Sequence, residues 1–527
     1  MRKPTACRQC RSARRKCVLS SPPALACRPC RDRLLQCSYA TTKDNDRQSI
    51  LRAALPREDS ISRLPANTSP AHQPLVEVYL RRIHDRPHSL FHPHSLLETV
   101  RQGTCSRALV LAICSMACWI SDNPNLRDVH ETLAFEAKTL LKADLENITL
   151  ENIQTSCIIA NLCEWSCNRT SEALFFRIAI GMAEIMNLST PDLSSPIAER
   201  ETKRRVFWTL FAADRWFSSG LHLGRLLDDF QKNVELPMDE SMFHVLDPAD
   251  MVLSKTWKPG LWAHMVGLHK LFGPILDLNH RCASEGILDN EREVLVADIA
   301  NRLASWETML PAGDRITEEN LHLHRQRGTG GTLIALHLAH NYYSLLLYFQ
   351  YLSHDHPLSS SQQTYMKRCK EHAEMYSRLV KLSREHSGCD ALFPTVSHMT
   401  VVSSSVLLHT LLFGDQEEVA NARATLHSNF EALVDFRLYW PGLTAQMIDR
   451  LTSFQEMCLL ASSKNQHTHD FDKWMLRFVV EFALPLNKRT FTLKRARELG
   501  GRVDAEHMAW FVEQRRLIDF DSFSFEV

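Results

Sequence analysis

A long buried helix is predicted by the stretch at residues 200–237, RETKRRVFWTLFAADRWFSSGLHLGRLLDDFQKNVELP. Its apolar residues recur at helical spacing and form one face, and Asp214 lies at the far end of that face. A carboxylate on a buried face needs a hydrogen-bonding or charged partner. We expect that partner to be one of four arginines: Arg204, Arg205, Arg215 or Arg225. The stretch therefore predicts a core helix that is braced by an internal charge.

The same helical pattern continues on both sides of this stretch. From about residue 74 to residue 460 the apolar residues follow helical spacing, glycine is scarce and alternating β-branched runs are few. The longest apolar runs are 108–120, which is too short to span a bilayer, and 332–352, which carries histidine, asparagine and glutamine. We interpret both as buried helices and expect no membrane span. The pattern predicts a mostly α fold with a large helical domain over residues 74–465.

The amino-terminal end differs sharply from the rest of the chain. The 527 residues have a formal net charge of zero, yet residues 1–40 contain ten lysines and arginines against one acid. Six of the sixteen cysteines fall there, spaced C-x2-C-x6-C-x9-C-x2-C-x6-C: Cys7, Cys10, Cys17, Cys27, Cys30 and Cys37. No apolar run follows the basic start, so we expect no secretory route and hence a reducing compartment. Metal sites are commoner than disulfides in such a compartment.

A binuclear zinc site is what these six thiolates predict. The half-motif occurs twice, as CRQCRSARRKC and CRPCRDRLLQC, and each C-x2-C step lets two thiolates converge on one tetrahedral ion. Two separate four-coordinate sites would need eight ligands, so two of the six thiolates must bridge. The prediction is a small domain over residues 1–40 that holds two Zn²⁺ per chain.

In the cysteine spacings and in the basic segment ending at Cys17, the chain resembles the fungal Zn2Cys6 binuclear cluster transcription factors. The stretch at 200–237, with its Arg-Arg, aromatic and Asp-Arg residues, is similar to the hallmark helix of that family's fungal-specific regulatory domain, and the likeness covers roughly residues 75–400. The resemblance implies a DNA-binding zinc cluster followed by a helical regulatory domain. It also implies that a small-molecule effector of the helical domain is among the partners.

The resemblance assigns roles to the basic residues between the first cysteines. It implies two short helices around the zinc pair, the first of which enters the major groove of double-stranded DNA and reads a CGG-like triplet. Arg14 takes the base-reading position, where relatives more often have lysine, and a guanidinium can contact guanine O6 and N7 together. Arg11, Arg15 and Lys16 would contact phosphates and set the register.

Other polar clusters are interpreted as structural. The four histidines near the start of the helical domain fit a helix followed by a proline-containing turn better than a metal site: His84, His88, His92 and His94. Three cysteines on an apolar helical stretch fit a core better than a redox site: Cys157, Cys163 and Cys167. The glycine-rich GTGGT at 328–332 has no strand before it and is interpreted as a flexible start to a helix rather than an anion site.

Residues 41–73 are predicted to be a linker, because the sequence there is polar and irregular. Its one apolar run, ILRAAL at 50–55, is too short for the three heptads that a stable coiled coil needs. We therefore expect a monomer or a weak homodimer.

The carboxyl-terminal region, 466–527, ends in LIDFDSFSFEV at 517–527, where aromatics alternate with acids. One interpretation is an edge strand. The other, which we favour, is an acidic–aromatic activation segment in which Phe520, Phe523 and Phe525 reach a coactivator groove.

The leading hypothesis is a nuclear, sequence-specific regulator of RNA polymerase II transcription, most simply an activator of a metabolic or biosynthetic gene set. Its partners would be DNA, the transcription machinery or a coactivator, and a small-molecule effector. The first alternative is a repressor with the same DNA-binding domain. The second is a helical enzyme or ligand carrier with a structural zinc module, which we disfavour because the chain has no P-loop, H-E-x-x-H or G-x-S-x-G motif.

Overall fold

The computed structural model describes residues 72–86, 88–121, 123–227, 234–253, 256–284, 287–352, 359–391, 393–462, 468–481 and 505–520. The chain divides into two compact units, Met1–Ser69 and Pro70–Val527, and the described residues all belong to the second. Within those ranges the regular elements are helices, and an isolated bridge pairs Met238 with Pro259. The prediction of a mostly α protein with a large helical domain is confirmed for this part of the chain.

The first part of the helical unit contains α5 (Gln73–Arg82), α6 (Pro93–Gln102), α7 (Arg107–Trp119), α8 (Pro124–Arg127), α9 (His130–Ala143), α10 (Leu150–Trp165), α11 (Arg169–Ile185) and α12 (Ile197–Leu221). Side chains just before the helices satisfy their first backbone N–H groups. The Thr149 hydroxyl accepts from the N–H of Asn152 at the start of α10, and Asn168 accepts from Ser171 at the start of α11. These helix starts therefore follow from local sequence.

The second part contains α13 (Glu240–Phe243), α14 (Leu261–Ala283), α15 (Asp289–Met309), η2 (Ala312–Asp314), α16 (Glu318–Gln326), α17 (Gly330–Tyr348), η3 (Phe349–Tyr351), α18 (Ser360–Glu385), α19 (Pro394–Phe413), α20 (Gln416–Arg437), α21 (Pro441–Ser462), α22 (Thr468–Val480) and α24 (Ala505–Glu513). Reciprocal capping boxes begin α18, through Ser359 and Gln362, and α20, through Asp415 and Glu418.

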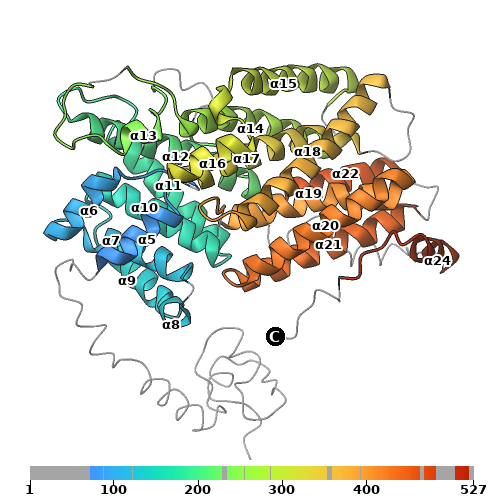
Figure 1. The fold of residues 1–527 in the computed structure, drawn as a ribbon, viewed down its shortest axis with the longest axis horizontal. Coiled ribbons are helices and arrows are strands. Elements are labelled where there is room, and N and C mark those ends of the chain that lie inside the picture. The colour runs from blue at the N-terminus through green and yellow to red at the C-terminus, as the bar shows by residue number, and fades with distance from the viewer. Residues whose placement is uncertain are drawn as a thin grey trace, which may run out of the picture. The chain divides into compact units, whose positions relative to one another are not determined.

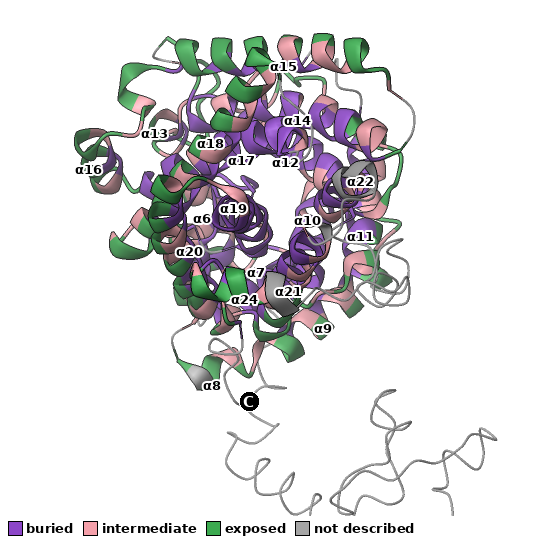
Figure 2. Ribbon diagram, turned by 90° about the vertical axis from the view of Figure 1, so that its right-hand side faces the viewer, coloured by how far each residue is buried: buried purple, intermediate pink, exposed green. Residues whose placement is uncertain are grey.

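The centre of the unit is built on α12, α14 and α17 (Figure 1). α12 packs against α11 and α14, and α17 packs against α14 and α18. Buried residues lie on the inward faces of these helices, whereas α15 and α16 turn exposed residues outward (Figure 2). The apolar face predicted for 200–237 lies in this centre, since Phe207, Phe211 and Phe217 are all buried. The helix itself ends at Leu221, where His222 takes a left-handed conformation.

α19 is the one described helix that is long and apolar enough to cross a membrane by length and composition. Its apolar window is 94% buried inside the protein, as expected of a core helix. The two apolar runs singled out from the sequence form α7 and α17, which are also buried. Other helices of the protein surround these three helices, and this burial explains their hydrophobicity without a membrane.

Candidate functional site

The predicted zinc ligands and DNA contacts all lie outside the described residues: Cys7, Cys10, Cys17, Cys27, Cys30, Cys37, Arg11, Arg14, Arg15 and Lys16. The linker over residues 41–73 lies outside them too, except for its last two residues. These assignments stay predictions. The geometry that follows concerns the helical unit.

Arg205 of α12 is a fully buried cation that ties three segments together. Its Nε donates to Glu201 Oε1 at 3.0 Å, and its Nη2 donates to the backbone carbonyl of Met238 at 2.6 Å. Its guanidinium lies 4.4 Å from the ring centre of Phe243 and 3.7 Å from a carboxylate oxygen of Asp85. Arg205 therefore joins α12 to the loop after α5 and to the segment around α13.

Asp214 closes the loop that follows α12. Its carboxylate accepts from the backbone N–H groups of Leu226 and Leu227, each at 3.0 Å, and from the Ser218 hydroxyl at 3.2 Å. Of the four arginines expected as partners, Arg215 lies 3.4 Å away, while Arg225 pairs with Asp277 at 2.6 Å. The expectation of an arginine partner is thus only partly right, because backbone amides make the shorter bonds and sequence does not reveal them.

The histidines that follow α5 brace a turn, as predicted. His84 Nε2 accepts from the backbone N–H groups of Leu90 and Phe91 at 3.1 and 3.0 Å. His88 shares a 2.7 Å hydrogen bond with the Tyr79 hydroxyl. Across the described ranges, no group of three or more histidine, cysteine or acidic side chains is arranged to hold a metal ion. These side chains therefore act in local folding.

The cysteines of α10 belong to the core, which agrees with the structural interpretation. Cys157 and Cys163 are buried, and Cys167 just after the helix is half-buried. Burial raises the pKa of the Cys157 thiol well above its ordinary value. A thiol held in its neutral form is a poor nucleophile, so this cluster does not form a reactive site.

The glycine-rich segment before α17 is a close contact and not a flexible start. Gly330 and Gly331 are buried, and a Cβ at Gly331 would lie 2.2 Å from Nε of Arg86. The backbone carbonyl oxygen of Asp390 would lie 2.8 Å from the same Cβ, so glycine is needed for this close approach. The interpretation as a flexible helix start is therefore wrong, because tertiary packing against Asp390 and Arg86 sets the requirement.

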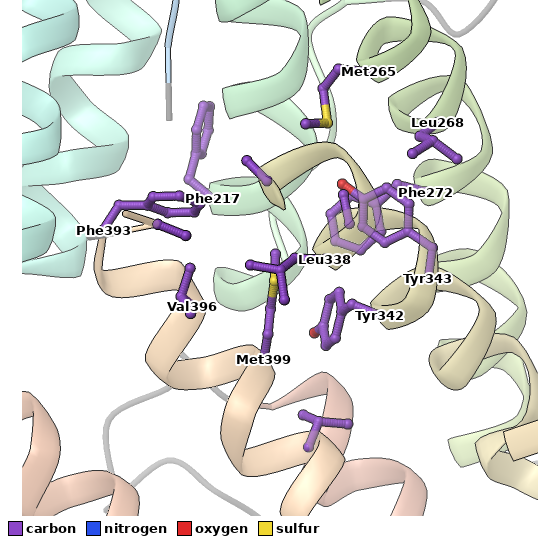
Figure 3. Close-up of a cluster of buried hydrophobic side chains, with 14 of the residues drawn as sticks. Phe217, Met265, Leu268, Phe272, Leu338, Tyr342, Tyr343, Phe393, Val396 and Met399 are labelled. Atoms are coloured by element: carbon purple, nitrogen blue, oxygen red, sulfur yellow. The ribbon is translucent and has the colours of Figure 1, made fainter. Parts of the chain in front are cut away.

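A cavity of about 80 Å³ lies where α10, α11, α12, α14, α17 and the start of α19 meet. Its walls are mainly aromatic, sulfur-containing and small side chains: Phe176, Trp216, Trp262, Tyr343, Phe393, Met265, Met399, Ala212, Ala213, Ala335 and Ala339. Figure 3 shows Met265, Phe393 and Met399 converging on this region from α14 and from the start of α19. Four alanines on α12 and α17 leave the space that larger residues would fill.

Two buried acids share one cation at the edge of this cavity. Glu164 and Glu172 both line it, and each places a carboxylate oxygen 3.0 Å from Nη1 of Arg169. The Thr395 hydroxyl also donates to Glu164 at 3.2 Å. Burial raises the pKa of Glu172 to about 7, with Arg169 opposing the rise and Glu164 adding to it. Glu172 therefore sits near the balance between its charged and neutral forms.

The wall also carries the buried guanidinium of Arg86, two histidines and a tryptophan. Burial lowers the pKa of both His88 and His269 to about 3, so both rings are uncharged near neutral pH. His269 Nδ1 shares a 2.8 Å hydrogen bond with the Tyr343 hydroxyl. The indole Nε1 of Trp262 is buried and has no hydrogen-bond partner. The cavity thus combines an aromatic wall, two carboxylates with the guanidiniums of Arg86 and Arg169 nearby, and the indole donor of Trp262.

The segment after α24 packs on the helical unit. Arg516 donates to backbone carbonyls at the end of α19, at 2.9 Å. Ile518 and the side chain of Gln455 exchange two hydrogen bonds, at 2.9 and 3.0 Å. Phe520 is 7% exposed and lies edge-on to Phe430, with ring centres 5.5 Å apart. The docked segment extends the packed unit beyond residue 465.

Burial of Phe520 differs from the exposed aromatic that an activation segment would present. The sequence pattern did not show this because acids next to an aromatic do not exclude burial of the ring. Phe523 and Phe525 lie outside the described residues, and their role stays a prediction.

The cavity residues were not singled out from the sequence. A signal existed in part: Glu164 and Glu172 are acids within otherwise apolar helical stretches, and Arg169 is three residues from Glu172. Trp262 lies on a different helix, and nothing in the sequence around it indicates that it borders the same cavity.

Residues 76–307 match the family described as the fungal specific transcription factor domain. The chain is 22% identical over 422 residues to the Zn(2)-C6 fungal-type transcription factor FTF1c of Fusarium oxysporum f. sp. lycopersici, which covers 72% of this chain and 44% of that relative. It is 22% identical over 433 residues to an uncharacterized transcriptional regulatory protein of Schizosaccharomyces pombe, with 72% and 52% coverage. A second such protein of that yeast is 25% identical over 235 residues, with 40% and 24% coverage. The chain thus spans about half the length of these relatives, or less.

Proposed function

We propose that the chain, whose residues 76–307 match the fungal specific transcription factor domain, is a transcription regulator and, more specifically, a sequence-specific activator of RNA polymerase II transcription in the nucleus. The observation that carries the proposal is the repeated cysteine spacing in residues 1–40, joined in one chain to that helical domain. In this proposal six cysteines hold two Zn²⁺, and the zinc cluster reads a CGG-like triplet in DNA. The chain acts as a monomer or weak homodimer on a metabolic or biosynthetic gene set.

Arg14 is the residue proposed to read a base. Replacing it with alanine is expected to weaken binding to a guanine-containing site by about 1–3 kcal/mol, because a bidentate contact to guanine is lost. The full chain is titrated at fixed salt into two labelled duplexes, one with the guanine-containing site and one of random sequence, and the two affinities are compared.

Arg14→Lys is the matched control, since it keeps the charge and one donor group. We expect it to retain most of the affinity and part of the preference for guanine. Equal losses on specific and random DNA in Arg14→Ala would instead place Arg14 on a phosphate.

The last residues are proposed to activate transcription by contacting a coactivator or the transcription machinery. Removal of residues 521–527, which takes away Phe523 and Phe525 but leaves the docked Phe520, is expected to reduce reporter output severalfold without changing DNA affinity. Reporter assays and DNA titrations on the same variant measure this.

Phe520→Ala serves as the comparison for that truncation. Because Phe520 is packed on Phe430, its loss should lower thermal stability instead. Unchanged reporter output after removal of 521–527 would contradict the activation role and favour the alternative, a repressor with the same DNA-binding domain.

The helical domain is proposed to be the regulatory part, with a small-molecule effector. The cavity between α10, α11, α12, α14 and α17 supports this role, because aromatic residues line it and a few polar groups converge on it. An enzyme is not proposed, since the relatives are named as transcription factors or regulators.

A further inference from the structure

A second hollow of the helical unit shares no residue with the cavity described above. It is a groove of about 710 Å³ between the first turns of α12 and the loops on either side of α13. Its lining is mostly apolar. Ile197 and Met238 are buried and form, with Phe243, a small cluster of their own, which serves as the floor of the groove.

One rim of this groove exposes large apolar side chains. Met251, Val252 and Trp257 line it and are 46%, 82% and 41% exposed. Isolated apolar residues are common on protein surfaces, but several that gather around one hollow mark an interaction site. A partner that covers this rim would remove three large apolar groups from water.

The form of the groove favours a polypeptide over an enclosed small molecule. Small-molecule sites bury about 70–90% of their ligand, whereas the rim at Val252 is open to solvent. Within the described residues, the backbone of Val252, Leu253 and Trp257 has no hydrogen-bond partner. These N–H and C=O groups are available to an extended chain, so a segment that binds along the rim can use its backbone as well as its side chains.

Arg200 gives the groove a positive charge that is not used in an ion pair. It lies on the same face of α12 as Arg204, four residues further on, and both line the groove. Arg204 pairs with Glu201 and Glu235. Arg200 instead donates from Nη2 to the backbone carbonyl of Met251 at 3.1 Å, and its buried Nε has no acceptor.

The carboxylates closest to Arg200 along the lining and the helix are engaged elsewhere. Glu199 pairs with Lys203, and Glu235 pairs with Arg204. No carboxylate in the described part of the chain forms an ion pair with Arg200. A buried donor without an acceptor is unfavourable, and a carboxylate facing the guanidinium would supply both an acceptor and an opposite charge. The groove therefore suits an acidic residue within an apolar segment.

We propose that this groove is the docking site for an extended, acidic–apolar segment of a partner protein. Apolar side chains of the segment pack between Met238 on the floor and Trp257 on the rim. Its backbone runs along Val252, and one of its carboxylates pairs with Arg200. The docking is independent of the proposed DNA recognition, since no residue of the groove belongs to residues 1–40.

The test begins with a selection of random dodecapeptides, displayed on phage, against the full chain without DNA. The library is first depleted on the Val252→Glu variant, which places a carboxylate on the rim but keeps the basic amino-terminal segment, so that peptides bound outside the groove are removed. We expect the recovered peptides to carry an aspartate or glutamate flanked by apolar residues. Recovery of no peptide, or of basic or uncharged peptides, overturns the proposal.

A matched pair of variants locates the bound peptide. The fluorescein-labelled consensus of the recovered peptides is titrated with each chain and followed by anisotropy. Val252→Glu should weaken binding at least tenfold, because the new carboxylate repels the acid of the peptide. Val245→Glu is the control, since Val245 is 74% exposed and lies outside the groove, and it should leave the affinity unchanged. Equal losses in the two variants, or a loss in neither, contradict docking in this groove.

Arg200→Gln tests the ion pair, because glutamine keeps a donor for the carbonyl of Met251. It should weaken binding of the consensus peptide at least tenfold but leave almost unchanged the affinity for the same peptide with its acid replaced by the amide. Arg200→Lys should keep part of the preference for the acid. An equal effect on both peptides, or no effect on either, overturns the proposed pairing.

Two further measurements identify other occupants of the groove. Sedimentation velocity compares the full chain with Val252→Glu, and a dimer that this substitution dissociates would show that a second copy fills the groove. Peptide affinity is also measured after removal of residues 521–527, and a tenfold gain would show that this segment of the chain itself fills it. Either result overturns the assignment to a partner protein, whereas unchanged association and unchanged affinity support it.

Discussion

Replacing Cys10 with serine is expected to remove zinc from the amino-terminal domain and to lower affinity for the specific DNA site by about 10³-fold or more. A serine hydroxyl is a much weaker zinc ligand than a thiolate, so the tetrahedral coordination is broken. The binding energy of structural zinc is folding energy for such a small domain. The arginines keep their charge but lose their fixed positions, and the residual binding should be non-specific and strongly salt-dependent.

Elemental analysis of the full chain and DNA titration at two salt concentrations measure this result. The wild-type chain should hold two Zn²⁺, and Cys10→Ser fewer. Cys282→Ser is the matched control, because Cys282 is half-buried in the helical unit and its Sγ donates to Gln350 at 3.4 Å, a bond that a hydroxyl can replace. Two zinc ions and full specific affinity in Cys10→Ser would rule out the zinc cluster.

Replacing Glu201 with alanine is expected to destabilise the helical unit by about 3–5 kcal/mol, because it leaves the buried guanidinium of Arg205 without its closest carboxylate. Both side chains are fully buried, and their atoms are 3.0 Å apart. Glu201 also accepts from the backbone N–H of Met238 at 2.8 Å, and alanine leaves that donor unsatisfied as well. Denaturant unfolding followed by circular dichroism measures the loss.

Glu199→Ala on the same helix is the control. Its ion pair with Lys203 is on the surface, so we expect a change of about 0–1 kcal/mol. A Glu201→Ala chain as stable as the control would show that other groups, such as Glu240 and Asp85, satisfy Arg205 unaided.

Much of the helical fold could be predicted because its signals are local. The spacing of Phe207, Phe211 and Phe217 predicts a buried face on one helix, and the structure places all three in the core. The turn that follows α5 could be predicted from prolines and histidines. Residues that act within one helix or one turn leave their mark on a short window of sequence.

Partners from distant segments could not be predicted in the same way. An arginine partner is predicted for Asp214, and Arg215 does lie 3.4 Å away, but the shorter bonds come from the backbone N–H groups of Leu226 and Leu227. Gly331 was interpreted as a source of flexibility, yet it makes room for Arg86. In each case the deciding atom belongs to the backbone or to a residue far away in sequence, which no local pattern encodes.

By itself, the sequence determined a basic amino-terminal segment with six ordered cysteines, a long helical body and the apolar face of its central helix, because thiolate spacing and helical periodicity are local properties. Only the tertiary structure decided that Phe520 is packed against Phe430, and that Glu172, Trp262 and Met399 border one cavity. These groups come from helices far apart in the chain. Their charge, burial and missing partners arise when the helices pack, so the site exists only in the folded unit.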